Sequence, residues 1–419
     1  MRRFLLLYEN PRWERLSPVA DLLPVPGLRF GASTLGSRWV AALGLPLLAV
    51  EARAGALAAW REPLPLCGER PAPGDEVLVV DAAALPGGWL AGLVEPAAAS
   101  LFVADGEPVA ARLSFRELAG CLTAGAAFES RLRGLGLPES AIEADVLRWP
   151  WDLVGRNVAA LESDLAARRG AIEGDVDANA ALIDRGRIIV GPGVRVDPFS
   201  VLDARGGPIL VGRDALVQAH SLIEGPCVIG AGTQVLGGVV RRSSVGPQCR
   251  VAGEVEETIW QGWANKRHHG FLGHSLVGEW VNLGALTTTS DLKNNYGPVR
   301  LWAGGQERES GTNKMGSVLG AHVKTGIGTL LPTGCSIGVA ANLFGGGRFV
   351  PKRLPAFAWW DGQRTVEHRL EPCLATAAVV VGRRGLELGE AERTALRELF
   401  AASSTERAAA MAACSSAGR

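Results

Sequence analysis

Short apolar runs alternate with amphipathic segments over the first 165 residues. Runs typical of buried strands occupy residues 4–8, 46–50, 76–81 and 99–105. Segments 52–61 and 114–122, which lie between them, have the composition and spacing of helices. Strands that alternate with helices indicate an α/β domain with a largely parallel sheet. We therefore expect such a domain over residues 1–165.

The apolar spacing then becomes helical. Val158, Leu161 and Leu165 lie three and four residues apart, which predicts a helix within residues 149–169. We expect this helix to leave the first domain and residues 166–182 to form a linker.

A different period begins near residue 183. Anchor positions, nearly all aliphatic, recur six residues apart within runs and are commonly followed by Gly or another small residue. The runs are Val190, Val196 and Leu202; after a three-residue slip, Val211, Val217, Ile223, Ile229 and Val235; then Val245 and Val251; and later Leu319, Thr325, Leu331, Ile337 and Leu343. Neither a helix nor an ordinary strand has a period of six. The pattern is the hexapeptide repeat, in which three units form one triangular coil. It predicts an all-β left-handed parallel β-helix over residues 183–350.

The six-residue period is lost between about 254 and 315, and again beyond 352. We expect the first break to be a loop region that leaves the coils, because loops on a rigid scaffold commonly carry binding groups. Residues 351–419 are expected to close the solenoid, with a closing segment at 364–372 and 376–384 and a terminal helix over 389–403. The last dozen residues are expected to be mobile.

Charge and cysteine usage exclude several classes of protein. The chain has 43 basic and 43 acidic residues and a pI near 7.0, which argues against nucleic acid as a partner. The opening run RFLLLYENP is too short and polar for a secretion signal, and no apolar stretch is long enough for a membrane span. Seven widely spaced cysteines without a CxxC motif indicate reduced thiols and a cytoplasmic location.

The basic residues are distributed unevenly. Only five of the 43 are Lys, and all lie between 266 and 352, at Lys266, Lys293, Lys314, Lys324 and Lys352. Six of the nine Asn and four of the six His fall in nearly the same window. Because Lys is a compact point charge suited to phosphate, we expect the chemistry to lie between residues 265 and 352.

Specific motifs in this window resemble a known family. The segment KRHHGFLGHSLVGEWVNLGA (266–285) and the later KNNYG (293–297) resemble the acetyltransferase half of the bifunctional UDP-N-acetylglucosamine diphosphorylase/glucosamine-1-phosphate N-acetyltransferases. The stretch 264–347 is similar to a divergent branch that pairs the β-helix with a shortened, Rossmann-like sugar nucleotidyltransferase domain. The PWDLV..N motif at 150–157 resembles the same branch. The resemblance implies a homotrimer with active sites between subunits.

The resemblance implies that the C-terminal half transfers an acetyl group from acetyl-CoA to an amino-sugar phosphate. The attacking amine must lose a proton near neutral pH, for which imidazole is suited. We assign the base to His268, with His269 as the alternative, since adjacent side chains in extended backbone point opposite ways. Asn282 and backbone N–H groups would stabilise the oxyanion.

The resemblance also suggests the binding residues of this half. The acceptor would contact the loop residues Lys293, Asn294, Asn295 and Tyr296 together with Lys314. Acetyl-CoA would lie along the coil edge, near Ala285, Lys324, Thr325, Thr329 and Lys352. Phe271 replaces the family's sugar-contacting Tyr, so the identity of the amino sugar stays open.

The N-terminal domain departs further from the family. The branch's Thr-Arg before Pro appears as Leu22-Leu23, the Gly-rich phosphate loop is missing, and no Lys precedes Lys266. UTP or dTTP would instead contact Arg12, Arg29, Asp152 and Asn157, with Asp81 as a ligand of Mg²⁺. Because nucleotidyl transfer depends on cations at a triphosphate, we expect this domain to be weak or inactive.

Two other readings remain open. His220, His269 and His274 could bind zinc, as in trimeric β-helix carbonic anhydrases, since three imidazoles and water make a catalytic zinc site. Alternatively, the chain could be a non-catalytic scaffold that binds a sugar nucleotide.

Overall fold

The computed structural model describes residues 1–95 and 98–416, and the chain divides into two compact units. The first contains Met1–Arg15, Leu22–Leu28 and Ser33–Arg148, and the second contains Leu16–Asp21, Arg29–Ala32 and Trp149–Arg419. Within the described residues, no helix is long and apolar enough to cross a membrane. The six cysteines whose side chains are described are all unpaired thiols.

The first unit is an α/β domain around one six-stranded sheet. Its strands follow the order β4 (Leu47–Glu51), β1 (Arg3–Tyr8), β5 (Glu76–Asp81), β7 (Glu107–Ser114), β6 (Ser100–Ala104) and β8 (Glu139–Ala141). Its helices are α1 (Leu35–Leu43), α2 (Ala54–Ala59), α3 (Leu90–Val94), α4 (Phe115–Leu118) and α5 (Phe128–Gly134). The core includes Phe4, Leu6, Val77, Val79 and Phe128, all nearly inaccessible to solvent.

The sheet is largely parallel, as predicted, and β7 is the one strand of the six that runs against the others. Strand β1 pairs in parallel with β4 and β5, whereas β7 runs antiparallel to both β5 and β6. Strand β7 is absent from the sequence prediction because its EPVAARLS sequence lacks a strong apolar run. Its signal is Asp105-Gly106, whose positive φ angles of 51° and 77° form the tight turn typical of a hairpin.

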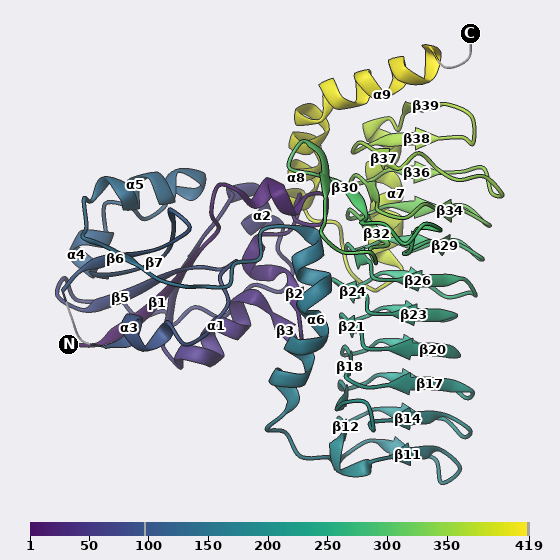
Figure 1. Ribbon diagram of the computed structural model, residues 1–419, viewed down its shortest axis with the longest axis horizontal. Helices are drawn as coiled ribbons and strands as arrows, with labels where there is room; N and C mark the ends of the chain where they lie inside the picture. The colour runs from purple at the N-terminus through teal and green to yellow at the C-terminus, as the bar shows by residue number, and fades with distance from the viewer. Residues whose placement is uncertain (96–97, 417–419) are drawn as a thin grey trace. The chain divides into compact units, whose positions relative to one another are not determined.

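The second unit begins with α6 (Pro150–Leu165) and continues as a parallel β-solenoid, which confirms the helix predicted within 149–169 and the β-helix class. Sheets of 11, 6 and 10 strands form its three faces. Figure 1 shows the coils as a regular stack, with the six-stranded face running from β11 (Ala181–Ile183) to β26 (Phe271–Gly273). All the predicted hexapeptide anchors are buried, with Thr325 the most accessible at 5%.

The coils extend further than the aliphatic pattern indicates. They begin at β9 (Ala171–Ile172), inside the predicted linker, and β37 (Arg353–Leu354) and β38 (Ala358–Trp360) add a coil beyond residue 350. The predicted break from 254 is also wrong, because only residues 290–316 leave the stack. Strand β27 (Leu276–Val277) pairs directly with β32 (Ser317–Leu319). Within the excursion, β30 (Arg300–Ala303) and β31 (Gln306–Glu309) form a hairpin.

The six-residue period is hard to recognise after residue 254 because non-aliphatic residues occupy some of the positions that point into the solenoid. Trp260 pairs with the inward Val245, Lys266 with Val251, and Thr289 with Leu331. The spacing of six persists through Trp260, Lys266 and Leu272, so the fold continues while the residue class changes.

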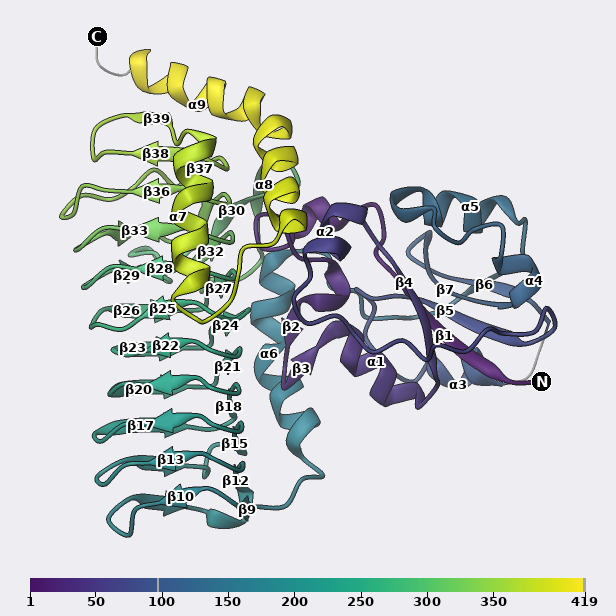
Figure 2. The ribbon, with the colours of Figure 1, turned by 180° about the vertical axis from the view of Figure 1, so that it is seen from behind.

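Three helices follow the last coil. They are α7 (Leu370–Gly382), α8 (Glu390–Ala402) and α9 (Ser404–Ser416), and Figure 2 shows α7 lying along one face of the solenoid. Ala377 and Val381 of α7 pack on Trp263 and Trp280. Helix α8 matches the predicted terminal helix. Helix α7 was not predicted, although it includes much of the segment 376–384. The residues expected to be mobile are helical as far as Ser416, and 417–419 lie outside the described residues.

Candidate functional site

The predicted catalytic histidines lie on one corner of the solenoid, between β25 (Asn265–Lys266) and β26. His268 and His269 are both exposed. Leu286 N donates to the carbonyl of His269 at 2.9 Å, so the next coil stacks directly on this corner. An exposed imidazole without a carboxylate neighbour can accept a proton from a bound substrate.

A buried lysine holds this corner in place. Lys266 is 1% exposed and its Nζ donates to the carbonyl oxygens of Ala252, His268 and Gly270, at 3.0, 3.1 and 2.6 Å. These three acceptors match the three donors of an ammonium group. Burial lowers the pKa of Lys266 to about 8. Lys266 is not among the predicted site residues, although its inward position in the six-residue repeat is a signal that identifies it.

His274 has a different environment. It is buried, with Nδ1 2.7 Å from Asp291 and Nε2 3.1 Å from Glu257. Burial opposes its protonation, but the hydrogen bonds to Asp291 and Glu257 outweigh this and raise the pKa of His274 to about 9. A charged imidazolium between two carboxylates anchors Asp291, at the start of the 290–316 excursion, and cannot serve as a base near neutral pH.

Within one chain, the described residues do not assemble this zinc site, and a site shared between subunits stays an alternative prediction. His274 is occupied by Glu257 and Asp291, and His220 stacks on Phe199 with ring centroids 5.8 Å apart. Over residues 1–95 and 98–416, the fold brings together no group of three His, Cys, Asp or Glu side chains arranged to hold a metal ion.

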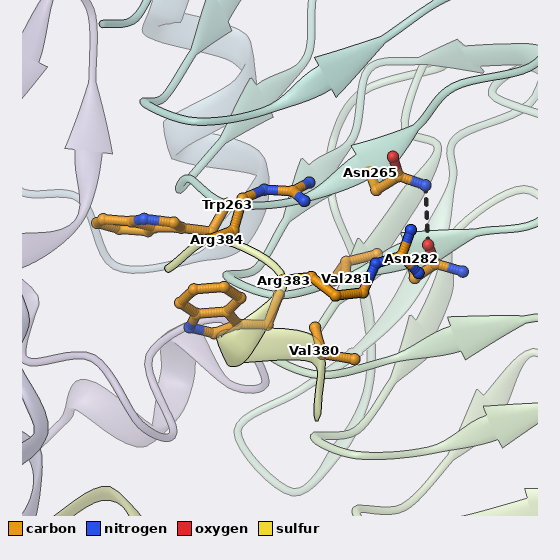
Figure 3. Close-up of a pocket in the computed structure, with 8 residues that line it drawn as sticks. Trp263, Asn265, Val281, Asn282, Val380, Arg383 and Arg384 are labelled. Atoms are coloured by element: carbon orange, nitrogen blue, oxygen red, sulfur yellow. Dashed lines mark hydrogen bonds between the residues drawn. The ribbon is translucent and has the colours of Figure 1, made fainter. Parts of the chain in front are cut away.

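Asn282 lines a small cavity on the solenoid face formed by β25 and β28 (Asn282–Leu283). Asn265 Nδ2 donates to Asn282 Oδ1 at 2.8 Å, which leaves the Asn282 amide group directed away from Asn265. The cavity has a volume of about 60 Å³ and is also lined by Trp263, Trp280, Val281, Val380, Arg383 and Arg384. Figure 3 shows the Arg383 side chain extending toward Asn282.

The predicted acceptor residues lie on the excursion from the coils. Lys293 Nζ donates to the Pro298 carbonyl, and Asn295 Oδ1 accepts from Gly297 N, so both stabilise a local turn. Asn294, Tyr296 and Lys314 are exposed, and Tyr296 is 70% accessible.

Four of the five predicted acetyl-CoA residues, Ala285, Lys324, Thr325 and Thr329, lie on adjacent coils. Thr325 is buried, where its hydroxyl meets Thr287 Oγ1 at 2.6 Å and accepts from Gly284 N. The Ala285 carbonyl accepts from Gly328 N, and Thr329 Oγ1 donates to Gly326 O. Lys324 Nζ donates to the His322 carbonyl, and burial lowers its pKa. Lys352 pairs with Glu307 at 3.1 Å.

In the first unit, the predicted nucleotide residues already have partners. Arg12 pairs with Glu129 at 2.9 Å and with Glu107 at 3.0 Å. Asp81 is 1% exposed, and its two oxygens accept from Asn10 Nδ2 and Ala83 N. Burial raises the pKa of Asp81 to about 7. Because both oxygens are hydrogen-bonded and the group is only partly ionised, Asp81 does not fit a Mg²⁺ ligand.

The other predicted nucleotide residues belong to the second unit. Arg29 donates from its backbone N to Gln261 Oε1 and from Nε to the Gln261 carbonyl. Asp152 caps α6 through Trp149 N. Asn157 is fully buried and its Oδ1 accepts from Gly31 N and Ser244 Oγ. These contacts join residues 29–32, α6 and the solenoid.

Comparisons with known proteins agree with the resemblance. Residues 5–170 match the family described as sugar nucleotidyl transferase. The bifunctional sugar-1-phosphate nucleotidylyltransferase/acetyltransferase of Sulfurisphaera tokodaii is 32% identical over 22% of this chain and 23% of its own. The bifunctional protein GlmU of Methylibium petroleiphilum is 30% identical over 43% of this chain and 35% of its own.

Among solved structures, the N-acyltransferase AntD from Bacillus cereus, crystallised with dTDP and 3-hydroxybutyryl-CoA, is 16% identical. The match covers 50% of this chain and 87% of the AntD chain, with a TM-score of 0.18. The chain thus spans between a quarter and two fifths of the length of the curated relatives it matches. It is similar in its first 170 residues to sugar nucleotidyl transferases, and in part of its length to bifunctional nucleotidylyltransferase/acetyltransferases.

Proposed function

We propose that this protein transfers the acetyl group of acetyl-CoA to the amino group of a sugar phosphate, at the corner that carries His268. The observation that carries this proposal is the Lys266 clamp, which holds an exposed histidine in a defined corner of a hexapeptide solenoid. The reactions printed in the names of the relatives, nucleotidyl transfer and acetyl transfer, support the same class of chemistry.

In the proposed reaction, the amine attacks the thioester carbonyl and a C–N bond forms. His268 accepts the proton that the amine loses. The oxyanion that develops accepts hydrogen bonds from Asn282 Nδ2 and nearby backbone N–H groups. The C–S bond then breaks, and the proton returns from His268 to the leaving thiolate. The products are the N-acetylated sugar phosphate and coenzyme A.

We further propose that the active site is completed by a second copy of the chain in a homotrimer. Exposed apolar side chains follow the same solenoid corner above His268: Leu286, Ile327 and Phe344 are 57%, 71% and 63% accessible. Gly328 N donates to the Ala285 carbonyl, and Phe344 lies against Gly326, so these corners stack in register. An apolar ridge of this kind favours association.

The N-terminal unit is proposed to be a weak nucleotidyltransferase. Its Arg12 is neutralised by two carboxylates, and Asp81 does not fit Mg²⁺. We therefore derive no step through a metal ion there. This unit would bind or position a sugar nucleotide more effectively than it turns one over.

The test is to incubate the protein with acetyl-CoA and a panel of amino-sugar phosphates while following free thiol. Thiol release that depends on one amino sugar supports the proposal. Binding of a sugar nucleotide without turnover of either substrate would favour the scaffold reading. Light scattering tests the assembly, and a monomeric mass at micromolar concentration would contradict the inter-subunit site.

A further inference from the structure

Four arginines from separate parts of the second unit lie near one another, and two of them, Arg383 and Arg384, line the Asn282 cavity. Arg250 lies on β22 (Arg250–Val251), Arg267 begins the histidine corner, and Arg383 and Arg384 follow α7. Arg250 pairs in the strand ladder with Asn265, and Asn265 with Asn282. The cluster therefore borders the face of the solenoid on which the predicted oxyanion donor lies.

These arginines lack the usual counter-charge. Throughout residues 1–95 and 98–416, no carboxylate forms an ion pair with any of the four. Arg250 Nη1 donates to the carbonyls of Gln248 and Cys249 at 3.1 Å, and Arg384 Nε to the Gln248 carbonyl at 3.4 Å. Carbonyl oxygens orient a guanidinium group but leave its positive charge uncompensated.

Neighbouring members of the cluster, Arg250 with Arg384 and Arg267 and Arg384 with Arg383, are close enough to repel each other. Burial lowers the pKa of Arg250, and Arg384 and Arg267 lower it further. Burial also lowers the pKa of Arg384, with an added contribution from Arg383. Elsewhere on the same strand ladder, Arg195 is paired with Asp197 at 2.9 Å. Like charges held together without a partner are relieved when an anion binds.

We propose that Arg250, Arg267, Arg383 and Arg384 form a site for the phosphate group of a substrate. Guanidinium groups bind phosphate through paired, charge-assisted hydrogen bonds. The cavity of about 60 Å³ takes one anionic group, and the rest of the ligand lies outside it toward His268. The arginine cluster alone is the basis for proposing an anion site, whereas the identity of the ligand rests on the proposed acetyl transfer.

The phosphate can come from either substrate, so the experiment uses three probes. Calorimetry measures the binding of pyrophosphate, of adenosine 3′,5′-bisphosphate as the phosphate-bearing part of the donor, and of glucosamine 1-phosphate as an acceptor. The double variant Arg383→Ala/Arg384→Ala should bind pyrophosphate at least about tenfold more weakly, or about 1.4 kcal/mol. If the double variant also binds the bisphosphate more weakly, the site belongs to the donor. If it binds glucosamine 1-phosphate more weakly, the site belongs to the acceptor.

Arg195→Ala is the matched control, because it removes one arginine from the same ladder at a position that already has a carboxylate partner. It should bind all three probes as the unaltered chain does. Equal binding by the double variant and the unaltered chain, or equal weakening by Arg195→Ala, would overturn the proposal. His268→Ala should keep full pyrophosphate affinity, which separates failure of the anion site from failure of the acetyltransferase assignment.

Discussion

Arg12 in the first unit and the arginines that follow α7 in the second unit have opposite environments. In the first unit, Arg12 lies between Glu107 and Glu129, and these hydrogen bonds and charges raise its pKa against the effect of burial. In the second unit, Arg383 and Arg384 follow α7, lie near other cations and form no ion pair among the described residues. Paired charges contribute to the stability of a fold, whereas unpaired charges remain available for a ligand.

The histidines of the solenoid repeat this contrast. His274 is buried between two carboxylates, while His268 is exposed on a corner that Lys266 holds by its carbonyls. We expect changes to the unpaired groups to reduce activity and changes to the paired groups to reduce stability. The following experiments test this division, beginning with the largest expected effect.

Replacing His268 by Ala should lower acetyl transfer by roughly 10²–10⁴-fold, the range for losing a general base. Because His268 is exposed, its replacement should leave the free energy of unfolding unchanged. The measurement is thiol release under saturating acetyl-CoA, with His220→Ala as the control on another exposed corner. If His269→Ala is the damaging change, the base is the neighbouring residue. If neither matters, the acetyltransferase assignment fails.

Replacing Arg12 by Ala should lower the free energy of unfolding by about 2 kcal/mol, because it leaves the buried Glu129 without its closest cation. Urea unfolding of the full chain measures this. Arg133→Ala is the control, since Arg133 contacts the same Glu129 from a more exposed position at 3.6 Å. An exposed pair should contribute less than about 1 kcal/mol. Equal effects of the two variants would mean that the Arg12 pairs are not structural.

Nucleotidyl transfer should be at least about tenfold slower than acetyl transfer, a difference of about 1.4 kcal/mol in barrier. The cations that a triphosphate requires are already paired in the first unit. Pyrophosphate release from UTP or dTTP, with a sugar 1-phosphate and Mg²⁺, measures this. Robust release that Arg29→Ala abolishes and Gln261→Ala preserves would contradict the expectation, because Gln261 is the residue to which Arg29 bonds.

The smallest effect concerns the pH dependence of stability through His274. Its pKa rises from 6.5 to about 9 on folding, so its contribution is complete below pH 6.5 and is lost as pH rises through 9. The destabilisation caused by His274→Gln should therefore be largest at pH 6 and should shrink by on the order of 1 kcal/mol by pH 9.5. A difference that stays constant with pH would show that His274 is not protonated in the folded state.

Lys266 provides a comparison of opposite sign. Folding lowers its pKa from 10.5 to about 8, so burial of the charged form costs stability below pH 8, and this cost is relieved as pH rises toward 10.5. The stability of the unaltered chain relative to Lys266→Met should therefore increase over this range, while the difference for His274→Gln decreases.

The sequence by itself determined the elements that depend on local repetition. The six-residue period identified the solenoid because each coil repeats the same inward position, and the helical spacing in 149–169 identified α6. The same logic failed where the inward residue was Trp260, Lys266 or Thr289, since the pattern records residue class and not backbone geometry. It also failed at β7, whose strand is specified mainly by its pairing with β5 and β6.

Only the tertiary structure decided which candidate side chains are free to act. Sequence placed His268, His269 and His274 in one motif, but burial and two carboxylates make His274 structural while the corner leaves His268 accessible. Arg250, Arg267 and Arg383 are separated by up to 133 residues and carry no motif. Parallel stacking of coils and the packing of α7 on Trp263 and Trp280 bring them together, because both depend on contacts between residues distant in the chain.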